Sequence, residues 1–166
     1  MEYAEAKQKF ISAWGSLGSS WGVNRTMAQI HALLLISIKP LSTEDIMHQL
    51  QISRGNANMN IRTLVDWGIV EKQLVQGERR EFFVANKDVW ALAKQIAKER
   101  KKRELEPIQK ILSQVRDAEG DSAEAREFRK TTGQLQDFAS QTENMLELFI
   151  HSTPTWFLNV LGKLKK

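Results

Sequence analysis

The stretch "SRGNANMNIR", from Ser53 to Arg62, decides the fold. Apolar residues in and after it keep the spacing of a helix that buries one side, namely Ala57, Ile61, Leu64 and Val65. Ser53 is a favourable N-cap and Gly68 a favourable residue just past a helix end, so we predict a helix from Ser53 to about Trp67. Asparagines, which are mediocre helix formers, stand at 56, 58 and 60, and they need an explanation.

The segments on either side of this helix extend the pattern. Helical periodicity precedes it over about Tyr3–Ser20, from an Asn24 cap to just before Pro40, and from a Ser42 capping box to about Leu50. After it, the apolar period shortens to about two in "IVEKQLV" and "REFFVA", which indicates two strands joined by a tight turn. Three helices and then a hairpin predict a mainly α fold with a small β-hairpin wing, a winged helix-turn-helix.

The C-terminal part of the chain is helical in pattern from Asp88 onward, with a kink predicted at Pro107 and a break at 118–122. One helix carries a heptad-like seam of Phe128, Thr131, Leu135, Phe138, Thr142, Met145 and Phe149. Thr153 and Pro154 fit the start of a last amphipathic helix that contains Trp156, Phe157, Val160, Leu161 and Leu164.

These patterns predict three regions. They are an N-terminal helix (1–23), a winged helix-turn-helix domain (24–87) and C-terminal helices (88–166). The apolar stripes of the first and third regions must be buried, and a two-fold homodimer achieves this economically for a protein that reads a palindromic site. The alternative is that the stripes pack within one subunit as a small bundle.

Composition limits the function classes. The chain of 166 residues has no cysteine, which excludes disulfides and thiol nucleophiles and favours a reducing cytoplasm. Its longest apolar run, Ala32–Ile38, is far shorter than the roughly 20 residues that span a membrane. The three histidines are scattered and no metal or catalytic motif occurs, so we expect neither an enzyme nor a cofactor.

Charge favours a polyanionic partner. The net charge is +4 and the pI about 9.4. Basic residues cluster at Arg79 and Arg80 and again in "KERKKRE" (98–104), whereas acids accumulate between Asp121 and Glu147. An anionic partner should therefore meet the first two-thirds of the chain.

The polar side of the helix that begins at Ser53 is suited to double-stranded DNA. It carries amides, guanidinium groups and small residues, with no acid before Asp66. Asn and Arg form paired hydrogen bonds with adenine and guanine edges in the major groove, and a helix N-terminus can bind phosphate. We predict DNA contacts from this helix and from the wing tip through Ser53, Arg54, Gly55, Asn56, Asn58, Met59, Arg62, Thr63, Arg79 and Arg80.

At this point the chain resembles a known family. The segments "WGVNRTMAQIHALLLI", "PLSTEDIMHQLQISRGNANMNIRTLVDWGIV" and "GERREFFVANKDVW" are similar to MarR-like winged-helix transcriptional regulators, in particular the glycine-betaine-synthesis regulator (GbsR) branch. The resemblance covers about Phe10 to Pro107. It implies a dimeric, sequence-specific DNA-binding regulator, often a repressor, with recognition helix Ser53–Trp67 and wing Leu74–Phe83. A small residue such as serine is common in that branch where this chain has Asn58.

Tryptophans raise the question of a small effector. Their faces hold quaternary ammonium ions by cation–π attraction, and the resembled branch is associated with choline-type effectors. The candidates for such a site are Trp14, Trp21, Trp90 and Trp156. Core packing is the more usual fate of a tryptophan.

Two rival interpretations stay open. In the first, the winged helix is a protein-interaction or dimerisation module that does not bind DNA. In the second, the winged part is only a scaffold for a helical small-molecule-binding or enzymatic protein. Salt-dependent duplex binding separates the main interpretation from the first rival.

Overall fold

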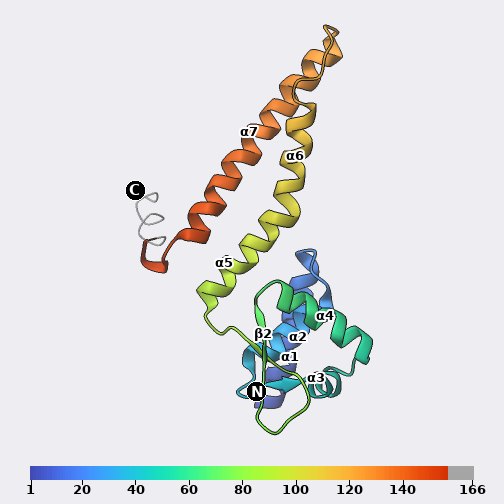
Figure 1. Cartoon of the computed structure of the whole chain (residues 1–166), viewed down its shortest axis with the longest axis vertical. Helices are drawn as coiled ribbons and strands as arrows, with labels where there is room; N and C mark the ends of the chain where they lie inside the picture. The colour runs from blue at the N-terminus through green and yellow to red at the C-terminus, as the bar shows by residue number, and fades with distance from the viewer. Residues whose placement is uncertain (157–166) are drawn as a thin grey trace. The chain divides into compact units, whose positions relative to one another are not determined.

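A computed structural model describes residues 1–156 (Figure 1). The chain divides into two compact units, Met1–Leu92 and a second that begins at Ala93, and the division falls within helix α5 (Val89–Arg100). Each unit is described by itself. None of the helices in the described part of the chain is long and apolar enough to span a membrane.

Helices α1 (Tyr3–Ser20) and α2 (Arg25–Ile36) pack closely in the first unit. A glycine makes this approach possible, because a Cβ atom added at Gly18 would lie 2.6 Å from the Cβ of Ala28. The predicted cap of α2 is confirmed: the side-chain oxygen of Asn24 accepts a hydrogen bond from the Met27 N–H at 3.1 Å. Helix α2 forms much of the core, since it is apolar around most of its circumference.

Helices α3 (Thr43–Leu50) and α4 (Arg54–Asp66) form the helix-turn-helix. The predicted capping box starts α3, with Ser42 and Asp45 each bonded to the other's backbone N–H. Ser53 caps α4 by accepting from the Asn56 N–H at 3.3 Å. Gly68 follows α4 with a φ of 67°, as the sequence predicts.

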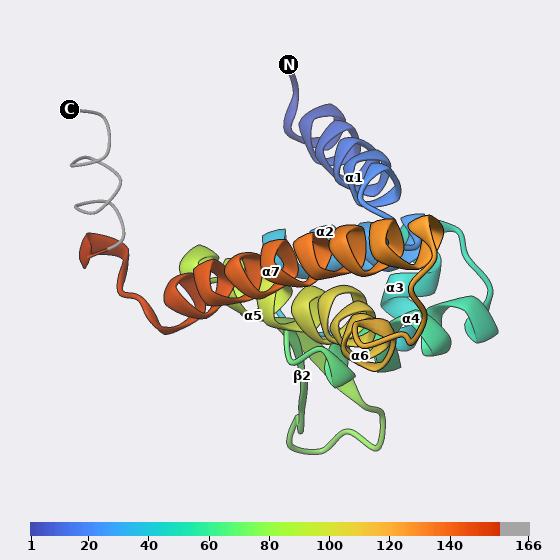
Figure 2. The same cartoon turned by 90° about the horizontal axis from the view of Figure 1, so that it is seen from above.

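Three antiparallel strands complete the first unit, in the order β1-β3-β2. The predicted hairpin pairs β2 (Val70–Gln73) with β3 (Phe82–Ala85), so that Val70 lies opposite Ala85. Its loop extends away from the helices (Figure 2). Strand β1 (Leu41–Ser42) pairs with the other side of β3. The sequence did not reveal β1, because two residues are too few to show an alternating pattern. The predicted winged-helix class is confirmed.

The second unit is a helical hairpin. After α5, the backbone forms one π-helical turn, η1 (Lys101–Leu105), which leads into α6 (Glu106–Val115). The disturbance predicted for Pro107 thus takes the form of this turn just before the proline, which lies in the first turn of α6. Residues 116–122 reverse the chain into α7 (Ala123–His151), and α6 and α7 lie side by side in both views (Figures 1 and 2).

Charges and buried residues hold this hairpin together. The Lys101 ammonium lies between the carboxylates of Glu143, at 3.0 Å, and Glu147, at 2.5 Å. Their hydrogen bonds raise the pKa of Lys101 and lower the pKa of both acids. Thr132 and Ala139 of α7 are buried.

The predicted last helix begins at Pro154, where the Thr153 hydroxyl accepts a hydrogen bond from the backbone N–H of Trp156. The residues of this helix from Phe157 onward lie outside the described part of the chain.

Candidate nucleic-acid interface

The outward face of α4 is polar and free of carboxylates through most of its length. Ala57, Ile61 and Leu64 are buried, as their spacing predicts, whereas Val65 is only half-buried. The exposed residues of the helix are Arg54, Gly55, Asn58, Met59, Arg62 and Asp66. Met59 is 59% exposed, which is unusual for a large apolar side chain and is suited to contact with a thymine methyl group. This face has the chemistry required for base contacts in a major groove.

The three asparagines differ in their roles. Asn60, which is not among the predicted DNA contacts, is only 3% exposed, and its amide nitrogen donates to the side-chain oxygen of Asn56 at 2.7 Å. Asn56 is half-buried, and its own amide nitrogen lies 3.5 Å from the Thr26 hydroxyl oxygen of α2. The prediction that the Asn56 side chain faces outward therefore differs from the structure. Asn56 thus connects α4 to α2, Asn60 holds the Asn56 side chain, and Asn58 is the one of the three that is exposed.

Thr63 is also half-buried. Its hydroxyl donates to the backbone oxygen of Met59 at 3.1 Å, one turn earlier in the helix. This local bond is typical of threonine within helices. Thr63 thus lies at the border of the exposed face.

Arg54, at the start of α4, is paired with an acid from the preceding helix. Its guanidinium lies 2.7 Å from the carboxylate of Glu44, and both side chains are substantially exposed. Exposed pairs of this kind contribute little to stability, so the arginine can exchange its partner for a phosphate at small cost. The acid-free face predicted from α4 alone therefore has one carboxylate at its edge, supplied by α3.

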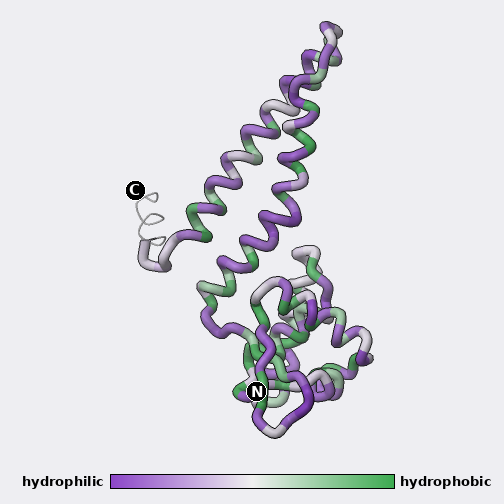
Figure 3. Tube along the Cα trace, viewed as in Figure 1, coloured by the Kyte–Doolittle hydropathy of each residue, from purple (hydrophilic) through white to green (hydrophobic). Residues whose placement is uncertain are grey.

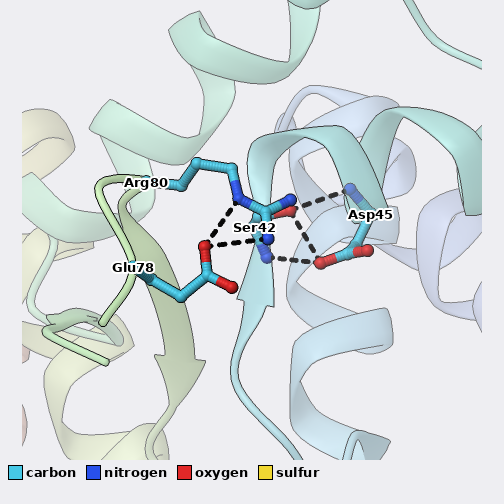
Figure 4. Close-up of polar contacts among 4 residues, drawn as sticks. All are labelled: Ser42, Asp45, Glu78 and Arg80. Atoms are coloured by element: carbon cyan, nitrogen blue, oxygen red, sulfur yellow. Dashed lines mark hydrogen bonds and ion pairs between the residues drawn. The ribbon is translucent and has the colours of Figure 1, made fainter. Parts of the chain in front are cut away.

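The two arginines of the wing have different surroundings. Arg79 is exposed, and no ion pair involves it within residues 1–156. Arg80 lies 3.0 Å from the Glu78 carboxylate and 5.5 Å from the centre of the Phe82 ring. Figure 4 shows Arg80 and Glu78 together with the Ser42 and Asp45 capping pair.

Electrostatics connect the wing to the start of α3. Hydrogen bonds from Ser42 are the main reason that the pKa of Asp45 is lowered, and the positive charge of Arg80 contributes further. Arg80 therefore serves partly to hold the wing, whereas Arg79 is the more available cation. Sequence alone does not separate adjacent arginines in this way.

A polar cleft lies between α4 and the hairpin. Its lining brings Asn58 and Arg62 together with the wing ion pair of Lys72 and Glu81, whose charged atoms are 2.7 Å apart. The sequence pattern did not indicate Lys72, because a lysine in a strand has no distinguishing neighbour. The cleft adds Lys72 to the surface of Arg54 and Arg62, and it also contains the carboxylates of Glu81 and Asp66.

The tryptophans predicted to bind an effector lie in different places. Trp14 packs against Phe10 and His31, with ring centres 5.5 and 6.4 Å away. Trp21 is about half exposed at the end of α1, and Trp90 lies in the first turn of α5, where its backbone N–H donates to the Asp88 carboxylate. Trp156 lines a hollow in the second unit with Glu147, Leu148 and His151 among its other residues.

These features define a winged helix-turn-helix whose second helix is α4 and whose wing is the β2–β3 hairpin. Residues 21–81, which contain α2, α3 and α4, match the sequence profile of the MarR family. A solved structure described as a transcriptional regulator has the same fold, with a TM-score of 0.67 and 19% identity over 86% of this chain and 93% of that chain. No curated protein matches the sequence.

Proposed function

We propose that this chain is a sequence-specific DNA-binding transcriptional regulator of the MarR type that acts in the cytoplasm. The observation that carries the proposal is the exposed face of α4, where Arg54, Asn58 and Arg62 are accessible, together with the exposed Arg79 of the wing. The match of residues 21–81 to the MarR family supports it. Arginine and asparagine are the side chains that read guanine and adenine edges, and the wing cation is suited to a minor groove or a phosphate.

The test is duplex binding by the full chain as a function of salt. We expect the affinity to fall by orders of magnitude between about 50 and 200 mM salt, as for a protein with six or more phosphate contacts. Arg62→Ala should weaken binding, while Arg116→Ala, which removes the same charge from an exposed site in the second unit, should leave it unchanged. Absence of duplex binding at 50 mM salt would favour the protein-interaction module instead.

The proposed regulator is a homodimer and a repressor. Two recognition helices that enter successive major grooves must lie about 34 Å apart, and a two-fold dimer on a palindromic operator satisfies that spacing. Apolar side chains left exposed on the second unit support the dimer. Sedimentation that shows a monomer at micromolar concentration would contradict it, and loss of target transcripts on deletion of the gene would contradict repression.

A cationic effector of choline type, and with it the GbsR branch, is part of the same proposal. Trp156 is the candidate best placed among the four tryptophans, because its hollow also contains the Glu147 carboxylate. Calorimetric titration with choline and glycine betaine should show heat that Trp156→Ala abolishes. Titration of the native chain without heat would remove the effector from the proposal.

A further inference from the structure

Met59 is an apolar side chain exposed in the middle of a polar surface. It is 59% exposed and lies near the centre of α4. Hydrophilic residues make up most of this helix (Figure 3). Gly55, one turn earlier, has no side chain, and nothing lies within 4 Å of a Cβ atom added there. The Met59 side chain is therefore open to small molecules dissolved in the surrounding water.

Thioethers are the sulfur groups of this chain, which has five methionines and no cysteine. Met27 is buried and Met47 is half-buried. The three exposed methionines are Met1, Met59 and Met145. Oxidation of sulfur side chains follows their exposure, so a peroxide in solution should react with these three first. Of the three, Met59 is the one that lies on α4.

Oxidation of Met59 would change the surface that we propose contacts DNA. The thioether is apolar and polarizable, and it is suited to contact with a thymine methyl group. Methionine sulfoxide is polar, and its oxygen accepts hydrogen bonds. Placed against a methyl group, the sulfoxide would lose its hydration without gaining a partner, which is costly. The oxidised side chain therefore opposes the contact that the reduced side chain favours.

The neighbouring Arg62 would be affected as well. It lies three residues after Met59, the spacing at which side chains of one helix are neighbours, and both side chains are exposed. A guanidinium group has only hydrogen-bond donors, so a sulfoxide oxygen supplies an acceptor for it. A sulfoxide at position 59 would thus compete with a guanine edge for the donors of Arg62.

We propose that Met59 is a site of reversible oxidation by peroxides, and that its sulfoxide form releases the chain from DNA. In the forward step the sulfur lone pair attacks one oxygen of a hydroperoxide, and the S–O bond forms as the O–O bond breaks. The proton of the transferred oxygen passes to the leaving oxygen, so the sulfur loses two electrons and the peroxide leaves as water or an alcohol.

The reverse step needs a methionine sulfoxide reductase and two thiols. The thiols supply two electrons and two protons, and the products are the thioether, a disulfide and water. The inference rests on the proposed DNA-binding function and adds how that function is regulated.

Treatment of the full chain with hydrogen peroxide tests the proposal. Mass spectrometry of peptides gives the oxidised fraction of each methionine, and titration in low salt gives the affinity for the duplex that the native chain selects. We expect the oxidised chain to bind about tenfold more weakly or less tightly still, and treatment with methionine sulfoxide reductase and dithiothreitol to restore binding. Bound duplex should slow the oxidation of Met59 but not that of Met1.

Variants with leucine separate the methionines from one another. Leucine is apolar and similar in volume to methionine, but it has no sulfur to oxidise. Peroxide should weaken duplex binding by Met145→Leu by the same factor as binding by the native chain, and it should not change the affinity of Met59→Leu from its own untreated value. Equal losses in the two variants would overturn the inference.

The native chain gives a second decisive result. Unchanged duplex binding by a chain whose Met59 is fully converted to sulfoxide would also overturn the inference. Failure of the untreated native chain to bind any duplex at about 50 mM salt would instead contradict the proposed function.

Discussion

The amide nitrogen of Asn60 lies 2.7 Å from the side-chain oxygen of Asn56 and 2.8 Å from its backbone oxygen. This buried contact fixes the Asn56 side chain, whose nitrogen in turn lies near Thr26 of α2. It explains how a helix rich in asparagine is stable, because the buried Asn60 amide donates to Asn56 and the half-buried Asn56 amide has its own acceptor in Thr26. Asn58, between them in sequence, is left to face solvent.

Asn60→Ala should therefore destabilise the protein. The change removes a buried hydrogen bond and leaves the Asn56 oxygen without its donor, which costs about 1 to 3 kcal/mol of the free energy of unfolding. Urea denaturation measures this cost. Asn58→Ala is the matched control, with a change below about 0.5 kcal/mol because its side chain is exposed. Equal losses for the two variants would contradict the division of roles.

Replacing Arg62 and replacing Arg79 should change DNA binding in different ways. Arg62→Ala is expected to cost about 1 to 3 kcal/mol on the cognate site and to relax its specificity, because the side chain lies on the face that we propose reads bases. Arg79→Ala should weaken all sequences similarly and lower the salt slope by about one, as expected for one lost phosphate contact. Binding titrations on cognate and scrambled duplexes separate these results. Unchanged binding by Arg62→Ala would remove that residue from the interface.

Glu44 should oppose DNA binding. Its carboxylate lies 2.7 Å from the Arg54 guanidinium, at the edge of the surface proposed to meet phosphates. Glu44→Gln should tighten duplex binding about twofold to fivefold in low salt, and the gain should shrink as salt rises. Glu119→Gln makes the same charge change at an exposed position of the second unit and should have no effect. Weaker binding by Glu44→Gln would contradict this prediction and would indicate that DNA binding by Arg54 depends on its ion pair with Glu44.

The contact between α1 and α2 depends on a small residue. Gly18→Ala places a methyl group 2.6 Å from the Cβ of Ala28, so we expect a loss of about 1 to 3 kcal/mol in thermal or urea unfolding. Gly133→Ala in α7 is the control with the opposite sign, since nothing lies within 4 Å of its added Cβ. That change should stabilise the helix by up to about 1 kcal/mol. A stabilising Gly18→Ala would contradict the close approach.

His31 should make stability depend on pH. Burial lowers its pKa to about 4, and its Nε2 atom has no hydrogen-bond partner among the described residues. Because the unfolded chain binds this proton near pH 6.5, stability from His31 is complete above that pH and is lost as pH falls toward 4, by on the order of 3 kcal/mol. Unfolding of the native chain and His31→Leu at several pH values isolates this loss. His48→Gln, at an exposed site, should keep the native dependence.

Sequence patterns predicted most of the local structure. The caps at Asn24, Ser42 and Ser53 are confirmed, because a cap is a contact between residues close in sequence. The inward orientation of the Asn56 side chain was not predictable, since it depends on a contact with Thr26, which is distant in sequence. The same is true of Glu44, which pairs with Arg54 from the preceding helix. The pairing of Arg80 with Glu78 is local, but the sequence does not indicate which of the two adjacent arginines takes the acid. Contacts between distant segments decide which polar residues of an exposed helix are available.

Selection of bound fragments from random DNA by the full chain tests the central claim most directly. We expect enrichment of a palindromic sequence whose half-sites are centred about ten base pairs, or a multiple of one helical turn, apart. An Asn58→Ala, Arg62→Ala double variant should lose that enrichment, because it removes two exposed side chains that we propose read base edges. Enrichment of no sequence by the native chain, or of the same sequence by the double variant, would contradict the assignment of α4 as the reading helix.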